Sequence, residues 1–274
     1  MVDLLHASSW VHEYPSWLFA IVLAVAMALA SEVGYRIARI RKAAVGDAGR
    51  GHFNAIQASL LALLALLLGF TLSMSNQLAQ ARNQLVLDDA IQVEALHLGS
   101  GYLPEPRRAE FSRLLREYVG LRADPAAIRR SLTRQELSAR ARQSVILHQQ
   151  MWDLVKGEMQ SEKPARGVEG LVPQLTQAQG IFRRRVHAFQ SRVSDSIILL
   201  LFSAAVAAGG VVGYSGGLGQ HRATMQSTLL AIFVSGTIYV ILDLDHPMSG
   251  FMRVDQTPML QIKATLDREA GASK

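Results

Sequence analysis

The chain contains no cysteine, which excludes a disulfide framework and a thiolate metal site. Catalytic signatures are equally scarce. The eight histidines are scattered, and none makes the two-ligand helix face of an H-E-x-x-H sequence. The closely spaced glycines from Gly209 to Gly217 lie in an apolar stretch, which is not the setting of a nucleophile elbow or a dinucleotide loop. We therefore expect a protein that is not an enzyme and uses no cofactor.

Charged residues are missing from four long stretches, residues 14–31, 51–81, 196–220 and 223–242. A bilayer core about 30 Å thick needs roughly 20 apolar residues of helix to cross it. The first stretch is slightly short, but it lengthens if Glu32 reaches the lipid headgroups. In a soluble protein such runs would be buried helices, yet 274 residues leave too little polar sequence to cover four of them. We therefore predict four transmembrane helices.

Lys and Arg are absent from the first sixteen residues. A cleaved signal peptide begins with a positively charged region, so the first apolar run does not fit one. Trp10, Tyr14 and Trp17 precede or open the run, as in the aromatic belt at a membrane interface. We expect this helix to remain as a membrane anchor.

The four runs form two hairpins separated by a long polar insert. The predicted architecture is an all-α polytopic membrane protein divided into three parts. They are a first transmembrane hairpin at residues 1–81, a helical extramembrane insert at 82–195, and a second hairpin with a C-terminal tail at 196–274. An even number of spans places the N-terminus, the insert and the tail on one side of the membrane.

Apolar spacing predicts that the insert is helical. Residues that recur at three- and four-residue intervals share one face of an amphipathic helix. Here they are Phe111, Leu114, Leu115, Tyr118, Val119 and Arg122. Residues 129–158 form a second long helical candidate. No helix breaker separates the second span from residues 77–98, so one helix should project out of the membrane.

The net charge is +6, but basic composition is common in membrane proteins, and no basic patch is interleaved with aromatic residues. We therefore expect no nucleic-acid partner. The loop between the first two spans is basic, which by the charge rule for short loops would place it in the cytoplasm. Arginines at 183–185 and 192, before the third span, lie on the opposite side and nearly balance the count. Charge alone leaves the orientation open.

One face of the second span has polar ends and an apolar middle. Its members alternate by four and three residues and are Ser59, Leu63, Leu66, Phe70 and Ser73. Such a face could line a narrow pore that gates by dewetting. Alternatively, it could be a seam against neighbouring helices of the same chain, with the serines bonded to the backbone. Spacing alone favours the seam.

Small residues recur every four positions along the third span, at Ala205, Gly209, Gly213 and Gly217. This spacing lets two helix backbones approach closely in lipid. We interpret the four as a helix-packing face.

Acidic residues follow the fourth span at Asp243 and Asp245, with Asp255 downstream. Carboxylates where a helix leaves the bilayer are costly unless they are hydrated, paired or bound to a cation. We expect a cation site or, in preference, salt bridges to the arginines at 183–185 or 192. Asp88, Asp89 and Glu94 should likewise join a salt-bridge network with the arginines that precede the third span. The sequence leaves metal binding undecided.

Three groups of residues carry a resemblance to a known family. They are Gly69-Phe70 with Arg82 and the acidic segment 88–94, Tyr102-Leu-Pro104 with residues 115–122, and the Asp-Leu-Asp-x-Pro-x-x-Gly sequence at 243–250. Spread over nearly the whole chain, they resemble the bestrophin-like family of small bacterial membrane proteins, which is distantly similar to the bestrophins.

Bestrophins are pentameric anion channels with four spans, a helical cytosolic domain between the second and third, and an apolar pore neck from the second. The resemblance implies a pore face through Leu63, Leu66 and Phe70, and it places the insert in the cytoplasm. Residues 71–81 depart from the pattern, because they lack the Arg- and Trp-rich stretch that follows the bestrophin neck.

Together these features predict a homo-oligomer in a lipid bilayer, expected in the bacterial inner membrane. Its leading function is passive ion conduction, with anions favoured by the basic character and Ser59 and Ser73 as the polar mouths of the constriction. The alternative is a non-conducting scaffold or sensor whose helical insert binds a soluble partner, which the sequence does not identify.

Overall fold

The computed structural model describes residues 15–41, 47–123, 134–191, 193–218, 224–245 and 254–272. All regular secondary structure in these ranges is helical, which confirms the all-α class. The chain divides into two compact units, each described here by itself. The span unit comprises Met1–Gln77 and Arg192–Met252, and the insert unit comprises Leu78–Ser191 and Arg253–Lys274.

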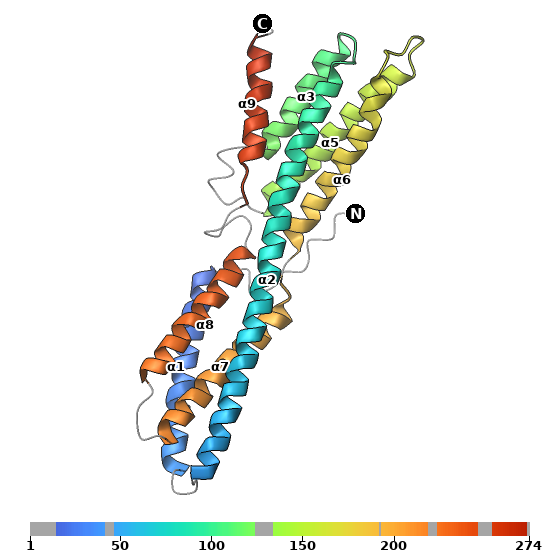
Figure 1. The fold of residues 1–274 in the computed structure, drawn as a ribbon. Coiled ribbons are helices and arrows are strands. Elements are labelled where there is room, and N and C mark those ends of the chain that lie inside the picture. The colour runs from blue at the N-terminus through green and yellow to red at the C-terminus, as the bar shows by residue number, and fades with distance from the viewer. Residues whose placement is uncertain are drawn as a thin grey trace. The chain divides into compact units, whose positions relative to one another are not determined.

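The span unit contains the helices predicted to cross the membrane, α1 (Ser16–Arg41), the first part of α2 (Asp47–Ser100), α7 (Asp195–Leu218) and α8 (Thr224–Leu244) (Figure 1). All four are long and apolar enough to cross a bilayer, as predicted. Helix α2 has 54 residues without a break. At about 1.5 Å per residue it is more than twice as long as a bilayer core is thick. The predicted continuation of the second span into a longer helix is therefore confirmed.

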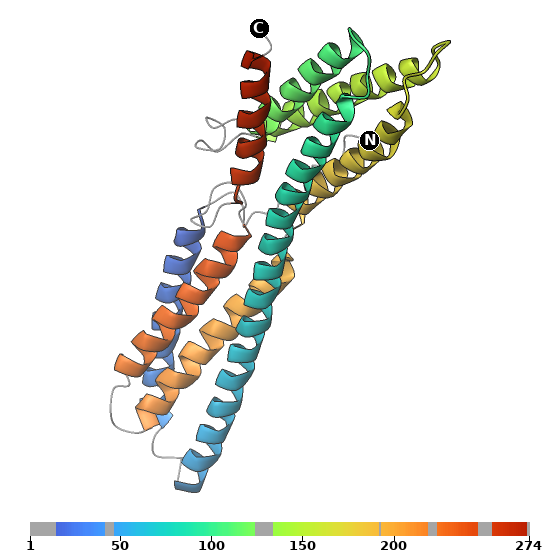
Figure 2. The same cartoon turned by 45° about the horizontal axis from the view of Figure 1, so that its top comes forward.

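Helix α7 packs against α1 through its small residues. Figure 2 shows both helices grouped with α8. Ala205, Gly209, Gly213 and Gly217 are all buried. A Cβ at Gly209 would lie 2.9 Å from the carbonyl oxygen of Met27, and one at Gly217 would lie 2.7 Å from that of Tyr35. The absent side chains allow the two backbones to approach closely.

Outward-facing residues of the spans are strongly apolar. Ile21, Val25 and Leu29 of α1 are each more than half exposed, as are Ile232 and Phe233 of α8. In water such a surface would be unfavourable by about 25 cal/mol per Å² of apolar area. In lipid it carries no such cost, so the exposure agrees with an integral membrane protein.

The insert unit is helical, as predicted from the spacing of its apolar residues. Besides the second part of α2, it contains α3 (Arg107–Arg122), α5 (Arg134–Met159), η3 (Val168–Gly170), α6 (Leu171–Gln190) and α9 (Thr257–Ala272). The predicted face of α3 is buried from Phe111 to Val119. Residues 129–133 of the second helical candidate lie outside the described residues.

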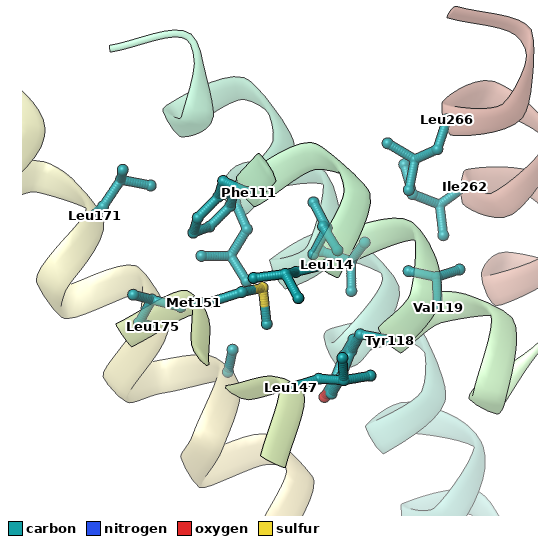
Figure 3. Close-up of a cluster of buried hydrophobic side chains, with 14 of the residues drawn as sticks. Phe111, Leu114, Tyr118, Val119, Leu147, Met151, Leu171, Leu175, Ile262 and Leu266 are labelled. Atoms are coloured by element: carbon teal, nitrogen blue, oxygen red, sulfur yellow. The ribbon is translucent and has the colours of Figure 1, made fainter. Parts of the chain in front are cut away.

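The core of the insert unit is formed by α3, α5, α6 and α9 together with the second part of α2. Figure 3 shows Phe111, Leu114 and Tyr118 of α3 meeting Leu147 and Met151 of α5, Leu171 and Leu175 of α6, and Ile262 and Leu266 of α9. Burying each large side chain contributes about 1.5–3 kcal/mol relative to leaving it exposed. This cluster gives the unit its own hydrophobic core.

The unit boundaries differ from the predicted parts in one important respect. The tail was predicted to belong with the second hairpin, within 196–274, yet Arg253–Lys274 belongs to the insert unit. The reason is that Met259, Ile262 and Leu266 of α9 are buried in the core of that unit. The insert itself begins at Leu78 and ends at Ser191, which is four residues earlier at each end than the predicted 82–195.

Replacing Gly213 with alanine should destabilise the span unit. A Cβ at Gly213 would overlap the carbonyl oxygen of Ser31, which belongs to the backbone of α1 and cannot rotate away. Overpacking of this kind costs about 1–3 kcal/mol. Thermal unfolding in detergent should show a lower Tm for Gly213→Ala than for the native chain.

The matched control is Gly236→Ala in α8, because a Cβ at Gly236 would have no atom within 4 Å. Alanine is a better helix former than glycine, so this variant should unfold at the native Tm or slightly above it. Equal Tm values for the two variants would contradict the close packing of α1 and α7.

Candidate functional site

The predicted face of the second span is exposed. Leu63 is 53% exposed, Leu66 54% and Phe70 66%, and Ser59 and Ser73 are exposed as well. The Ser59 hydroxyl donates to the carbonyl oxygen of Ala55 at 3.0 Å, within the same helix. The face is therefore not a seam covered by other helices of its own chain within the span unit.

The same exposed face continues along α2 into the insert unit. The four- and three-residue spacing is kept by Gln77, Gln80, Gln84, Leu87, Ile91, Glu94 and Leu98, and every one of these side chains is exposed. We call the whole set from Ser59 to Leu98 the α2 stripe. Its continuation beyond Gln77 was not predicted, although the heptad-like spacing was present in the sequence.

The opposite face of α2 is buried within each unit. In the span unit Leu64, Leu68 and Thr71 are buried, and the Ser75 hydroxyl donates to the carbonyl oxygen of Ile241 of α8 at 3.4 Å. In the insert unit Val86, Val93 and Leu96 are part of the hydrophobic core. Helix α2 is thus fixed along one side and bare along the α2 stripe.

Basic side chains are kept off the α2 stripe. Arg82 is the sole Lys or Arg between residues 51 and 100, and it is 2% exposed. Its guanidinium donates from Nε to the carbonyl oxygen of Ala188 at 3.1 Å and from Nη2 to that of Ser191 at 2.6 Å. A cation at the C-terminal end of α6 stabilises the unpaired carbonyls and the helix dipole there.

A buried charge cluster lies on the covered side of α2, in the insert unit. Asp89 accepts a hydrogen bond from Nη1 of Arg185, as the predicted network required, and is paired with Nη1 of Arg122 at 3.2 Å. Arg122 had been predicted only as part of an apolar helix face. Two neighbouring acids were predicted to join the same network. Asp88 instead accepts a hydrogen bond from Nε2 of Gln84 at 2.9 Å, and Glu94 lies on the α2 stripe.

Two further titratable groups adjoin this cluster. The Tyr118 hydroxyl accepts a hydrogen bond from Arg122, and burial raises the pKa of Tyr118 to about 12. The His148 ring lies 5.5 Å from the Tyr118 ring, and its Nε2 is 3.1 Å from the carbonyl oxygen of Leu175. Burial lowers the pKa of His148, so both side chains are neutral at neutral pH.

The acids after the fourth span have local partners. Asp243 and Asp245 are buried, and Oδ1 of Asp245 accepts from the backbone N–H of Val193 at 3.1 Å, just before α7. Asp255 belongs to the insert unit, where it accepts from the N–H of Thr257 at 2.9 Å and caps α9. These hydrogen bonds lower the pKa of Asp255.

A cation site among these acids has no support from the described residues, which contain no group of three His, Cys, Asp or Glu placed to hold a metal. The expected pairing of Asp243 or Asp245 with the arginines at 183–185 stays a prediction for Arg183 and Arg184. Arg185 pairs with Asp89. Arg192 and His246–Gly250 lie outside the described residues.

Residues 213–217 match the G-x-S-x-G pattern of a nucleophile elbow by letter alone. That motif needs a sharp turn from strand to helix to expose its serine. Here all five residues lie inside α7, and Gly213 and Gly217 face the backbone of α1. The pattern is therefore explained by helix packing.

Comparison with known proteins agrees with this architecture. Residues 28–259 match the family model of the Bestrophin-like domain. A crystal structure of a bacterial bestrophin homologue from Klebsiella pneumoniae is 16% identical, with a TM-score of 0.63 over 93% of this chain and 98% of that one. A point mutant of the Klebsiella pneumoniae homologue is also 16% identical, with a TM-score of 0.64 over 92% and 99% of the two chains.

A crystal structure described only as a membrane protein variant gives a TM-score of 0.65 at 16% identity, covering 88% of this chain and 94% of its own. At this level of identity the likeness to solved structures concerns the fold. No curated protein matches the chain.

Proposed function

This chain belongs to the Bestrophin-like family, and on that premise we propose that several copies assemble around α2 into a passive ion channel. The observation that carries the proposal is the α2 stripe, an exposed face that runs through both units on one unbroken helix. In a channel of this kind the stripe of each copy would face a shared central axis.

Within the span unit the stripe supports an apolar constriction. Leu63, Leu66 and Phe70 are successive members of the stripe, and all three are more than half exposed. A ring of such side chains excludes water when it is narrow, which gates a pore by dewetting. Ser59 and Ser73 on either side would supply the polar mouths.

Within the insert unit the stripe supports assembly. Leu87 is 41% exposed, Ile91 55% and Leu98 70%, and all three belong to the insert unit. An exposed apolar row on an extramembrane helix is typical of a surface covered by another protein chain. Because the row continues the stripe of the spans, a second copy of the same chain is the occupant that fits both parts.

The charges on the stripe favour cations over anions. The net charge of +6 had favoured anions, but no Lys or Arg belongs to the stripe and Glu94 is its one charged member. Several copies would bring their Glu94 carboxylates into a ring, and acidic rings select cations in channels. We therefore propose conduction of small cations through the bacterial inner membrane, with the insert in the cytoplasm.

A non-conducting scaffold or sensor is the second candidate, because α5 also carries exposed apolar side chains. Val145 and Ile146 are each 50% exposed on the insert unit. They would suit a soluble partner that binds the insert. Purified chains that assemble in liposomes and conduct no ion would support this candidate.

Replacing Phe70 with alanine should raise ion conductance in reconstituted bilayers, because a smaller side chain widens and hydrates the constriction. The control is Phe233→Ala in α8, which removes an equally exposed ring that is not on the stripe. It should conduct as the native chain does. If native chain and Phe70→Ala both stay at the background of protein-free lipid, the pore proposal fails.

Replacing Glu94 with glutamine should weaken cation selectivity, and Glu94→Lys should shift it toward anions. The measurement is the reversal potential across a bilayer with a KCl gradient, since its sign reports which ion carries the current. Glu169→Gln, which removes an exposed carboxylate of η3, is the matched control and should leave the potential unchanged. A reversal potential unaffected by Glu94→Lys would contradict the acidic ring.

A further inference from the structure

The cluster around Asp89 has an excess of positive charge. It contains two guanidinium groups, those of Arg122 and Arg185, and one carboxylate. Tyr118 and His148, the other titratable side chains in contact with it, are neutral at neutral pH. The net charge of the cluster is therefore +1 before any other group is added.

This excess charge is buried. The side chains of Asp89, Arg185 and Arg122 are 1%, 7% and 9% exposed. An uncompensated charge in such a place is strongly unfavourable. Arginine does not relieve the cost by losing its proton, because it stays charged in proteins. A compensating negative charge is thus expected beside the two arginines.

Among the residues that the structure describes, the groups that surround the arginines supply no second anion. The guanidinium carbon of Arg122 lies 4.9 Å from the ring centres of both Phe182 and Tyr118. These ring faces attract a cation but carry no net charge. The desolvation caused by burial, with the nearby charge of Arg122, lowers the pKa of Arg185, which is the direction expected for an under-compensated cation.

One donor in the cluster is left over. Asp89 accepts from Nη1 of Arg185, while Nε of Arg185 is fully buried and has no hydrogen-bond partner among the described residues. A buried N–H without an acceptor is unfavourable by about 1–3 kcal/mol. The missing negative charge and the missing acceptor therefore coincide at one side chain.

We propose that Nε of Arg185, next to Arg122, binds a small inorganic anion of single charge, of the halide or nitrate class. A single charge neutralises the cluster, to which α2, α3 and α6 contribute Asp89, Arg122 and Arg185. The site stabilises the insert unit and is distinct from the α2 stripe, which lies on the exposed side of α2. It does not depend on ion conduction.

The first test is thermal unfolding of the full chain in detergent at constant ionic strength, with sodium gluconate replaced stepwise by chloride, bromide or nitrate. An anion that binds the folded chain alone should raise Tm, by about 3–6 °C for each tenfold increase above its Kd. Arg185→Gln should abolish the effect. The neighbouring exposed arginine gives the matched control, Arg184→Gln, which should keep it.

The second test needs no variant. Crystals of the native chain grown in bromide should show an anomalous peak within hydrogen-bonding distance of Nε of Arg185. A peak there supports the site even if Arg185→Gln does not fold. The proposal is overturned if the peak is absent, or if halides raise the Tm of Arg185→Gln as much as that of the native chain.

Discussion

The arrangement depends on one constraint, which is that a single unbroken helix presents one exposed face in two different surroundings. In the span unit Leu63 and Phe70 are exposed on that face. In the insert unit, which has a hydrophobic core of its own, Ile91 and Leu98 remain exposed on the same face. In the proposed assembly, a neighbouring copy of the chain would relieve the cost of the second part and would place the first part around a common axis.

Much of the fold follows from simple physical signals in the sequence. The four spans are marked by missing charges, and the helical insert by the spacing of residues such as Phe111 and Tyr118. The place of the tail was not predictable in this way. The spacing of its apolar residues indicates an amphipathic helix but does not show which core buries Ile262 and Leu266. The pairing of Arg122 with Asp89 was missed as well, since the apolar spacing of α3 does not show which residue of α2 its last arginine contacts.

The candidate site shows why composition is a poor guide to local charge. The basic residues that raise the net charge do not lie on the α2 stripe. Arg82 caps α6, and Arg122 and Arg185 are buried around Asp89. The side chains on the stripe are apolar, hydroxyl, amide or acidic. The proposed cation preference rests on this local charge, whereas the expected anion preference rested on net charge alone.

The central claim is that the α2 stripe faces other copies of the chain, and cysteine crosslinking tests it directly because the native chain has no thiol. In native membranes Ile91→Cys, treated with a short bis-maleimide, should give covalent multimers of the chain. Thr176→Cys, an exposed position on α6, should label but remain monomeric. If Ile91→Cys labels fully and also remains monomeric, other copies do not cover the stripe and the account is contradicted.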